Sequence, residues 1–346
     1  MLAARLAAID DLQLGEVETP SPGPGEILVK VGADTLCGTD HKIISGAKTN
    51  FVQLPVILGH ESAGHVAEVG TGVEGYEVGD PVAMMPAIPD RRCWPCRHDL
   101  ENACEHKRLM GYAVDGGLAE YMLVPVDGVD AGCLFKANAD LPSEQLALAE
   151  PLGCVINGQR QSRVEPDDVV VVMGAGPIGL FHTQLARIAG AREIIVSQRS
   201  APRRELALRL GATIGVNPEE QDLGEVVKET TGGLGADVVI VCIGVPELVN
   251  EALHLSRIGG RVNLFAGIKG KGWAEVEANL IHYNQIQVTG SSDARRSDYE
   301  TALRLIESGR VDTESMISHR FPLSKLSDAL ATAAGKEAIK VAVTPS

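Results

Sequence analysis

The sequence predicts an α/β protein with two domains, one of them built on a doubly wound parallel sheet. Residues 169–173 form a continuous apolar run of the kind that is buried on both faces of such a sheet. The sequence GAGPIG at 174–179 follows directly and opens a predicted helix over 180–189. Strand and helix patterns then alternate to about residue 290. The chain before residue 150 instead reads mainly as short strands separated by glycine-rich turns.

The glycines after the apolar strand predict a dinucleotide-binding loop. A strand, the spacing G-x-G-x-x-G and a helix, in this order, allow a tight turn at the helix start. Backbone N–H groups at the N-terminus of that helix then approach a pyrophosphate. The residues expected in this loop are Gly174, Gly176, Pro177, Ile178 and Gly179.

The end of the next predicted strand, at 193–197, bears on which cofactor is bound. An acidic residue usually stands there and holds the ribose 2′-OH of NAD. Gln198 occupies that position here, so no carboxylate would repel a 2′-phosphate. Arg199 and Arg203 are able to clamp such a phosphate, and Ser197 is able to donate to it. Alternatively, these arginines cap a solvated helix start. We expect NADP rather than NAD.

Three residues in the first half of the chain predict a catalytic zinc site. Cys37, His60 and Glu61 offer a thiolate, an imidazole and a carboxylate, a mixed set that leaves a position open for a substrate oxygen. Glu150 precedes a proline, so we expect it on extended backbone outside a helix interior. It is either a fourth or exchanging ligand or a charge at a helix end. In the alternative interpretation Cys37 and His60 are unconnected buried residues.

A second set of residues has the spacing of a structural zinc site. Asp90, Cys93, Cys96 and Cys104 form the pattern D-x2-C-x2-C-x7-C, a closed set of four ligands with no position for a substrate. An aspartate among thiolates is a harder ligand and binds zinc less strongly. The alternative is a surface loop without metal, or with a reducible disulfide.

Composition excludes several classes of function. The net charge of −15 and the pI near 5.1 argue against a nucleic-acid partner. No apolar run reaches membrane-spanning length, and the N-terminus lacks the pattern of a signal peptide. Seven cysteines cannot all pair, and four lie in metal-type surroundings, which favours a reducing compartment. We therefore expect a cytoplasmic protein that binds neither membranes nor nucleic acids.

Taken together, these stretches resemble the zinc-dependent medium-chain alcohol dehydrogenases along nearly the whole chain. The marks of this resemblance are Cys37-Gly38-Thr39-Asp40, the run GHE-x2-G-x5-G from Gly59 to Gly70, the structural-zinc spacing, Glu150-Pro151 and the glycine loop. Within this superfamily the chain is most similar to polyol and sugar dehydrogenases such as the sorbitol enzymes. The features closest to them are Glu150-Pro151-Leu152, the sequence NLFAG at 263–267 and His282-Tyr283.

The resemblance implies an architecture and a reaction. Residues 1–150 and 291–346 would form a GroES-like β-barrel catalytic domain, and 151–290 a Rossmann NAD(P)-binding domain, in a homodimer or homotetramer. The implied activity is the reversible oxidation of a secondary alcohol of a polyol, sugar or sugar acid, by hydride transfer to the nicotinamide. Zinc would act as a Lewis acid on the substrate hydroxyl.

Individual roles also follow from the resemblance. Cys37 and His60 match zinc ligands, and Thr39 matches the hydroxyl that takes the substrate's proton. Glu61 and Glu150 match two carboxylates whose roles differ among relatives.

The chain departs from its relatives at three places. Asp90 replaces a cysteine of the structural zinc site. Lys42, with His41 beside it, stands where many relatives place the outer histidine of a proton relay. Gln198 replaces the ribose-binding acid, as in the NADP-using minority.

Two other functions are alternatives to a polyol or sugar dehydrogenase. One is L-threonine 3-dehydrogenase or a simple secondary-alcohol dehydrogenase. The other is a zinc-free nucleotide-binding structural protein, against which the joint presence of Cys37, Thr39, His60 and Glu61 argues.

Overall fold

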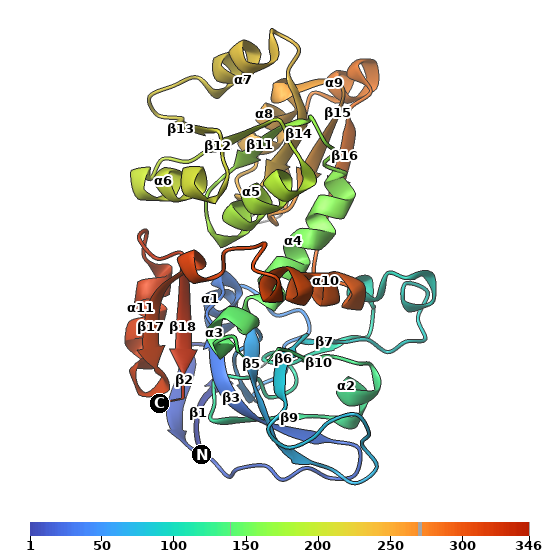
Figure 1. The fold of residues 1–346 in the computed structure, drawn as a ribbon, viewed down its shortest axis with the longest axis vertical. Coiled ribbons are helices and arrows are strands. Elements are labelled where there is room, and N and C mark those ends of the chain that lie inside the picture. Colours follow the sequence, from blue (N-terminus) through green and yellow to red (C-terminus); the bar gives the residue numbers. More distant parts are fainter. Residues whose placement is uncertain (139, 269–271, 346) are drawn as a thin grey trace. The chain divides into compact units, whose positions relative to one another are not determined.

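A computed structural model describes residues 1–138, 140–268 and 272–345. The chain divides into two compact units (Figure 1). The first unit joins Met1–Gly153 to Ala294–Ser346, and the second is the continuous segment Cys154–Asp293. Each boundary lies three residues beyond the one expected from the sequence. In the part of the chain that the structure describes, no helix combines the length and the apolar character needed to span a membrane.

The first unit is built on a seven-stranded sheet that combines strands from both ends of the chain. Its strand order is β10-β6-β5-β3-β18-β17, and β9 also pairs with β3. The last strand lies antiparallel to β3, with Ala342 opposite Thr35. This pairing brings the C-terminal segment beside residues that precede Cys37. The strands are β3 (Ile27–Thr35), β5 (Ser62–Val69), β6 (Pro81–Met84), β9 (Tyr121–Val124), β10 (Leu134–Lys136), β17 (Ile317–Pro322) and β18 (Lys340–Thr344).

Smaller elements complete this unit. The short strands are β1 (Leu2–Ala8), β2 (Asp11–Glu16), β4 (Val56–Ile57), β7 (Ala87–Ile88) and β8 (Arg108–Leu109). The helices are α1 (Gly38–Ile44), α2 (Val126–Asp130), α3 (Ser143–Ala147), α4 (Ala149–Ser162, which continues into the second unit), α10 (Arg296–Glu307) and α11 (Leu326–Ala334). Four 3-10 turns are η1 (Cys96–His98), η2 (Glu101–Ala103), η3 (Glu314–Met316) and η4 (Leu323–Lys325). One buried apolar cluster joins Leu36, Ile43 and Leu58 to Leu326 and Val341, and so fixes α1 against the C-terminal segment.

The second unit is a six-stranded parallel sheet in the order β13-β12-β11-β14-β15-β16. The order reverses at β11, which pairs with both β12 and β14, and a switch point of this kind is where open α/β sheets bind ligands. The strands are β11 (Val169–Met173), β12 (Glu193–Ser197), β13 (Ile214–Val216), β14 (Ala236–Val241), β15 (Ser256–Leu264) and β16 (Gln287–Gly290). The helices are α5 (Pro177–Ala189), α6 (Ala201–Leu210), α7 (Leu223–Thr231), α8 (Glu247–Leu255) and α9 (Ala278–Asn284).

Sequence patterns located these elements closely. All five residues of β11 are buried, as the apolar run predicts. Helix α5 begins at Pro177, three residues before the predicted start, because Gly176 serves as its N-cap. Proline suits the first position of a helix, where its missing N–H group is not needed.

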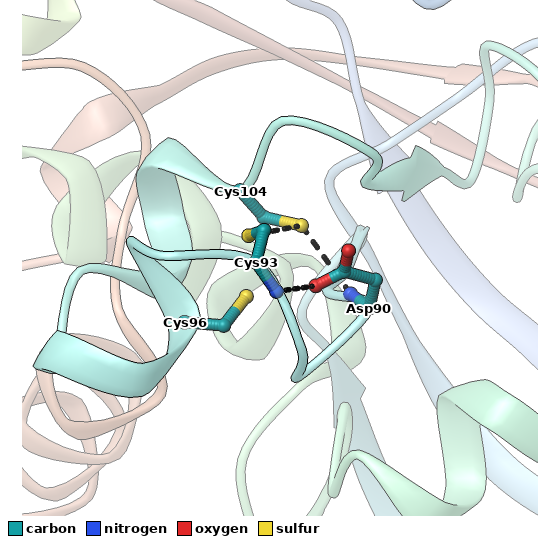
Figure 2. Close-up of side chains that lie close together, drawn as sticks. All are labelled: Asp90, Cys93, Cys96 and Cys104. Atoms are coloured by element: carbon teal, nitrogen blue, oxygen red, sulfur yellow. Dashed lines mark hydrogen bonds between the residues drawn. The ribbon is translucent and has the colours of Figure 1, made fainter.

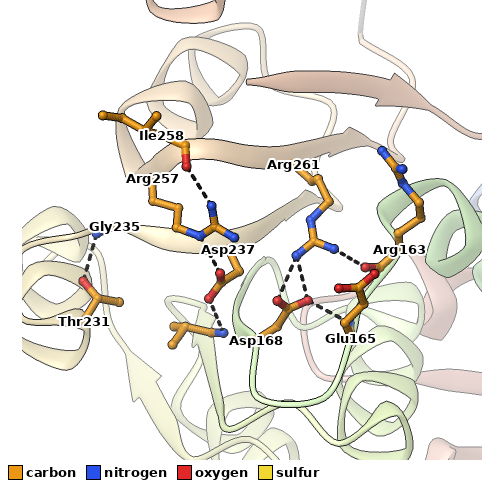
Figure 3. Close-up of polar contacts among 10 residues, drawn as sticks. Arg163, Glu165, Asp168, Thr231, Gly235, Asp237, Arg257, Ile258 and Arg261 are labelled. Atoms are coloured by element: carbon orange, nitrogen blue, oxygen red, sulfur yellow. Dashed lines mark hydrogen bonds and ion pairs between the residues drawn. The ribbon is translucent and has the colours of Figure 1, made fainter. Parts of the chain in front are cut away.

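Two ion pairs connect the starts of β11 and β14 to β15 (Figure 3). Asp168, just before β11, accepts two hydrogen bonds from Arg261 at 2.8 and 2.9 Å, and both side chains are buried. Asp237 in β14 accepts one from Arg257 at 2.5 Å, and its other oxygen accepts the N–H of Val169 at 2.8 Å. The buried charges of Asp168 and Arg261 need such pairing to offset their desolvation. The network therefore aligns three strands of the sheet.

Candidate metal and cofactor sites

Cys37, His60 and Glu61 come together in the first unit. Cys37 is the N-cap of α1, and its backbone N–H donates to the carboxylate of Asp40 at 2.8 Å. His60 and Glu61 stand directly before β5. One ligand atom from each of the three residues lies within 4.8 Å of the other two. A thiol, an imidazole and a carboxylate at this spacing suit a single zinc ion, so the donor set fits the predicted metal.

Gly59 is required where the chain delivers His60 to this cluster. Its φ of +98° lies in the region that side chains rarely adopt. A Cβ atom at this position would lie 2.5 Å from the backbone nitrogen of Leu118 and 2.8 Å from Oδ2 of Asp34. Any larger residue would therefore push the following imidazole out of place.

Asp40 orients the imidazole of His60. Its Oδ1 lies 3.2 Å from Nδ1 of His60, and both side chains are buried. Burial lowers the pKa of His60, but the charge and hydrogen bond of Asp40, together with Tyr112 and Cys37, outweigh burial and raise the pKa well above 6.5. With Nδ1 facing this carboxylate, Nε2 remains for a metal, an arrangement in which the carboxylate fixes the ring. The ring of Tyr112 packs edge-on against the same imidazole, with 5.5 Å between centroids.

Glu61 is held by two residues that sequence reasoning missed. Its Oε2 accepts hydrogen bonds from the hydroxyl of Thr35 and the ammonium of Lys340. Lys340 is buried in β18 and also donates to the carbonyl of Leu36 at 3.2 Å. Burial lowers the pKa of Lys340, but the Glu61 carboxylate, together with Cys37 and Glu150, outweighs burial and raises the pKa. The sequence carried a signal for Lys340, a single charge inside the apolar run at 338–343.

The prediction for the backbone of Glu150 was wrong. Glu150 lies in the first turn of α4 and not on extended backbone. Pro151 follows it as the third residue of that helix, within the turn whose N–H groups have no partner in the helix. Glu150 is not among the three residues that converge. Its charge nevertheless contributes to raising the pKa of Lys340.

Asp90, Cys93, Cys96 and Cys104 converge as predicted (Figure 2). The sulfur atoms of Cys93 and Cys104 are 3.7 Å apart. A tetrahedral zinc with bonds of about 2.3 Å separates its sulfur ligands by about 3.8 Å, so the spacing fits the ion. All seven cysteines of the chain are free thiols.

Asp90 is preorganised as an anion in this cluster. Its Oδ1 accepts the backbone N–H groups of Arg92 at 2.9 Å and Cys93 at 3.0 Å. These two hydrogen bonds hold the pKa of Asp90 well below its usual range. The carboxylate is therefore ionised at neutral pH, as a ligand must be.

The glycine loop of the second unit has the geometry predicted for it. Gly174 adopts a φ of +107°, and a Cβ atom on Gly179 would lie 1.8 Å from the carbonyl oxygen of Gly174. Only glycine allows the first turn of α5 to approach the end of β11 this closely. Ile178 lies with Pro177 in that turn, whose free N–H groups can meet a phosphate.

A cavity of about 250 Å³ lies beside this loop. Gly174, Ser197, Gln198 and Arg199 line it, whereas Gly176, Pro177, Ile178, Gly179 and Arg203 are not part of its lining. Sequence reasoning missed the other lining residues, which are Met173, Pro218, Ile243, Val245, Leu248 and Glu251. Several of these follow the ends of β13 and β14, where parallel sheets bind ligands, so their position after those strands was a usable signal.

Arg199, a predicted phosphate-binding residue, already has a partner in the second unit. Nη1 of Arg199 lies 3.2 Å from Glu219, and both side chains are exposed. Arg204, which was not predicted, donates to the carbonyls of Gln198 at 2.7 Å and Arg199 at 2.6 Å. The turn after β12 is thus fixed by Arg204, while the guanidinium of Arg199 remains at the surface. Burial lowers the pKa of Arg203.

Comparisons with known proteins agree with this geometry. Residues 23–131 match the alcohol dehydrogenase GroES-like domain, and 177–308 match the zinc-binding dehydrogenase family. L-threonine 3-dehydrogenase of Pyrococcus abyssi is 36% identical over 89% of this chain and 88% of its own. Sorbitol dehydrogenase of Bacillus subtilis is 31% identical over 100% and 98%. A zinc-binding dehydrogenase of Sinorhizobium meliloti 1021, solved with NADP, is 34% identical, with a TM-score of 0.93 over 99% of both chains.

These similarities confirm the predicted superfamily, the fold class of a GroES-like domain with a Rossmann sheet, and the reaction type. They also agree with a catalytic and a structural zinc site and with NAD(P) binding. The chain therefore belongs to the zinc-binding medium-chain alcohol dehydrogenase superfamily, as a zinc-containing enzyme that acts on a CH–OH group.

Proposed function

We propose that this enzyme reversibly oxidises a secondary hydroxyl group of a polyol, sugar or sugar acid to the ketone, with NADP as the preferred cofactor. The convergence of Cys37, His60 and Glu61 carries this proposal. Two similar proteins are named for threonine and sorbitol, and each of these molecules offers a secondary hydroxyl group. The two named substrates therefore share the reacting group and differ in the rest of the molecule.

The residues of the first unit would divide the chemistry as follows. Cys37, His60 and Glu61 would hold zinc, with Glu150 as a group that exchanges with Glu61. When bound, zinc supplies a Lewis acid that lowers the pKa of the substrate hydroxyl. Thr39, half-buried in the first turn of α1, would accept a hydrogen bond from that hydroxyl at its Oγ1 and pass its own hydroxyl proton outward as the substrate proton is transferred to it.

The structural cluster would stabilise the unit that contains the catalytic cluster. Asp90, Cys93, Cys96 and Cys104 would hold a second zinc that joins the loop at 90–104 into one rigid piece. A closed set of four ligands leaves no position for substrate, so this ion would stabilise the fold and take no part in turnover.

The preference for NADP is supported by the turn after β12. Among the residues that line the cavity there, Gln198 stands where an acid would hold the ribose, and Arg199 adds a positive charge. The similar protein of Sinorhizobium meliloti was solved with NADP. A 2′-phosphate would compete with Glu219 for the exposed guanidinium of Arg199, since charge-assisted hydrogen bonds to phosphate are strong.

The variant Gln198→Asp tests this preference. A carboxylate at 198 would repel the 2′-phosphate and accept hydrogen bonds from the ribose of NAD. We expect kcat/KM for NADP to fall by about tenfold to a hundredfold, and that for NAD to rise. Gln221→Asp, at an exposed position of the same unit, adds the same charge as a control. Equal effects of the two variants would show that residue 198 does not select the cofactor.

A second candidate, L-threonine 3-dehydrogenase, is favoured by a separate observation. The similar Pyrococcus abyssi protein of that name is 36% identical to this chain, against 31% for the sorbitol enzyme of Bacillus subtilis. Threonine differs from polyols in its carboxylate and its amino group, so the two functions require different groups around the substrate.

A substrate panel separates these functions. Zinc-loaded protein would be assayed with sorbitol, other polyols, sugar acids and L-threonine, each with NAD and with NADP. We expect turnover of at least one polyol, sugar or sugar acid, with NADP ahead of NAD. Turnover of L-threonine alone would replace the first proposal by the second, and turnover of none would contradict both.

We also propose a homodimer that forms through the edge of the second unit. Strand β16 pairs with β15 on one side, and in the described part of the sheet its other edge has no partner strand. Val288 on this strand is 39% exposed. Because an unpaired strand edge favours pairing with another chain, light scattering should give the mass of a dimer or a multiple of it.

A further inference from the structure

Lys48 contacts the ring of Tyr112, and this ring packs against His60 of the metal-binding cluster. Its Nζ lies 5.7 Å from the centroid of the Tyr112 ring. That ring meets the imidazole of His60 edge-on, at 5.5 Å between centroids and with 76° between the ring planes. All three residues belong to the first unit. The ring that contacts this positive charge is therefore the same ring that packs against the imidazole expected to bind zinc.

Both ends of this contact are anchored by the backbone. The N–H group of Lys48 donates to the carbonyl of Lys42 at 2.9 Å, which ties the lysine to the end of α1. The carbonyl of Tyr112 accepts the N–H group of Gln53 at 2.9 Å, and the tyrosine side chain is buried. The loop that carries Lys48 and the segment that carries Tyr112 are thus linked on either side of the contact.

The charge of Lys48 is not neutralised within the described residues. No carboxylate of those residues forms an ion pair with it, whereas Lys136, Lys228 and Lys340 each pair with an acidic side chain. Glu61 of the metal cluster and Asp40 beside it have partners of their own, Lys340 and His60 respectively. An ammonium group has three donors, and a contact with a ring face uses none of them as a hydrogen bond to an acceptor.

We propose that Lys48 binds a carboxylate of the substrate, so that the enzyme prefers a hydroxy acid over a neutral polyol. The inference rests on the proposed function, because it assumes that the substrate hydroxyl lies at the Cys37, His60 and Glu61 cluster. Its physical basis is that a charge-assisted hydrogen bond to a carboxylate is stronger than the cation–π contact that it would replace. Sugar acids and β-hydroxy amino acids share this chemistry and are separated by the test.

The test compares an acid with its neutral counterpart and adds a hydroxy amino acid. Zinc-loaded wild-type protein and the variant Lys48→Met would be assayed with D-gluconate, with its neutral counterpart D-sorbitol and with L-threonine. In the variant we expect KM for the preferred acid to rise at least tenfold. Values of kcat, and both constants for sorbitol, should change less than twofold. Lys48→Arg should restore most of the affinity, because it keeps the charge. Lys228→Met removes the same charge from the other unit as a control.

Binding decides the inference independently of turnover. Calorimetry would measure the affinity of D-gluconate, L-threonine and D-sorbitol for the zinc-loaded proteins, and thermal unfolding would check that each variant is folded. Lys48→Gln provides a second variant if Lys48→Met does not fold. Tighter binding of either acid to wild type than to the Lys48 variants supports the inference, even if the proposed oxidation fails. Equal binding of both acids to wild type and to the folded variants overturns it, and so does an equal loss for acids and sorbitol.

Discussion

Lys340, in the last strand of the chain, places a positive charge against Glu61 of the metal cluster. It is buried, and it contacts Glu61 across 279 positions of sequence. A buried carboxylate loses its hydration, and here the ammonium and the hydroxyl of Thr35 replace it. Both hydrogen bonds use Oε2, so Oε1 of Glu61 is the oxygen left for a metal. The pair thus sets which face of the carboxylate the cluster can use.

The variant Lys340→Met tests this role. Removing one partner of a buried ion pair leaves an uncompensated charge, so we expect the free energy of unfolding to fall by about 3–5 kcal/mol. We also expect the affinity for zinc to fall by about tenfold to a hundredfold, because Glu61 loses a group that orients it. Chemical denaturation and competition with a zinc chelator measure the two effects.

A matched control is Lys325→Met, whose ammonium is exposed and lies 3.9 Å from Asp328. Lys340→Arg should recover part of the zinc affinity lost in Lys340→Met. An affinity for zinc that is the same in wild type and in Lys340→Met would show that the lysine has no positioning role.

At the residue scale, the sequence predicted the metal ligands better than the residues that hold them in place. Cys37, His60 and Glu61 were identifiable because their chemistry is specific and because their motifs are short and local. Thr35 and Lys340 were missed because their contact with Glu61 depends on how β18 pairs with β3. Threonine and lysine are also common residues, so neither indicates a metal site by itself.

At the scale of elements, the ion pairs that link β15 to the starts of β11 and β14 hold three strands of the second unit's sheet in register. Arg261 in β15 binds both carboxylate oxygens of Asp168 and also donates to the carbonyl of Arg163 (Figure 3). Its side chain is only 10% exposed, and that of Asp168 only 8%. Water cannot replace the guanidinium at this depth, so the cost of losing it is large.

We therefore expect Arg261→Met to lower the free energy of unfolding by about 3–5 kcal/mol. Guanidinium denaturation measures this loss. Arg304→Met is the comparison, because Arg304 is exposed and its ion pair with Glu300 spans 3.8 Å. An exposed pair contributes at most about 1 kcal/mol. Similar losses in the two variants would contradict a structural role for the buried pair.

Asp237 should make the second unit sensitive to acid. Burial raises the pKa of Asp237, but the N–H group of Val169 and the guanidinium of Arg257 outweigh it and hold the pKa below 3.8. A carboxylate with a lowered folded-state pKa stabilises the fold above its ordinary pKa, and this contribution is lost as the pH falls through the folded value. Between about pH 5 and pH 3, wild type should lose stability more steeply than Asp237→Asn. Parallel pH profiles of unfolding would contradict this assignment.

Local patterns predicted the elements of the second unit more reliably than those near Glu150. The apolar run at 169–173 and the strand at 193–197 match β11 and β12 residue for residue. Glu150 was placed on extended backbone because proline disfavours helix in the residue before it. That preference did not decide the backbone here, because Pro151 lies in the first turn of α4, where a helix tolerates proline.

At the scale of the whole molecule, the central claim is that one zinc drives the chemistry and another stabilises the fold. The two clusters belong to the same unit and share no residue. Cys37 lies at the start of α1, whereas Cys96 lies in η1. Substituting one cysteine of each cluster therefore separates the two roles.

The sequence predicted the class of both units, since the strand–glycine–helix order and the metal spacings are local. It did not predict that β18 would lie between β3 and β17, because strand order depends on contacts between distant segments. That order is what brings Lys340 to Glu61. The pattern of the last strand could have singled out Lys340 as a buried charge, but its contact with Glu61 depends on the topology and could not be predicted.

The zinc content and turnover of Cys37→Ser, beside those of Cys96→Ser, test the central claim most directly. We predict that Cys37→Ser loses one zinc ion per chain and about a thousandfold or more in kcat/KM, yet keeps its thermal stability. Cys96→Ser should lose the other ion and unfold more readily, while the protein that remains folded still turns over substrate. Full turnover by a Cys37→Ser protein without zinc in that cluster would contradict the account.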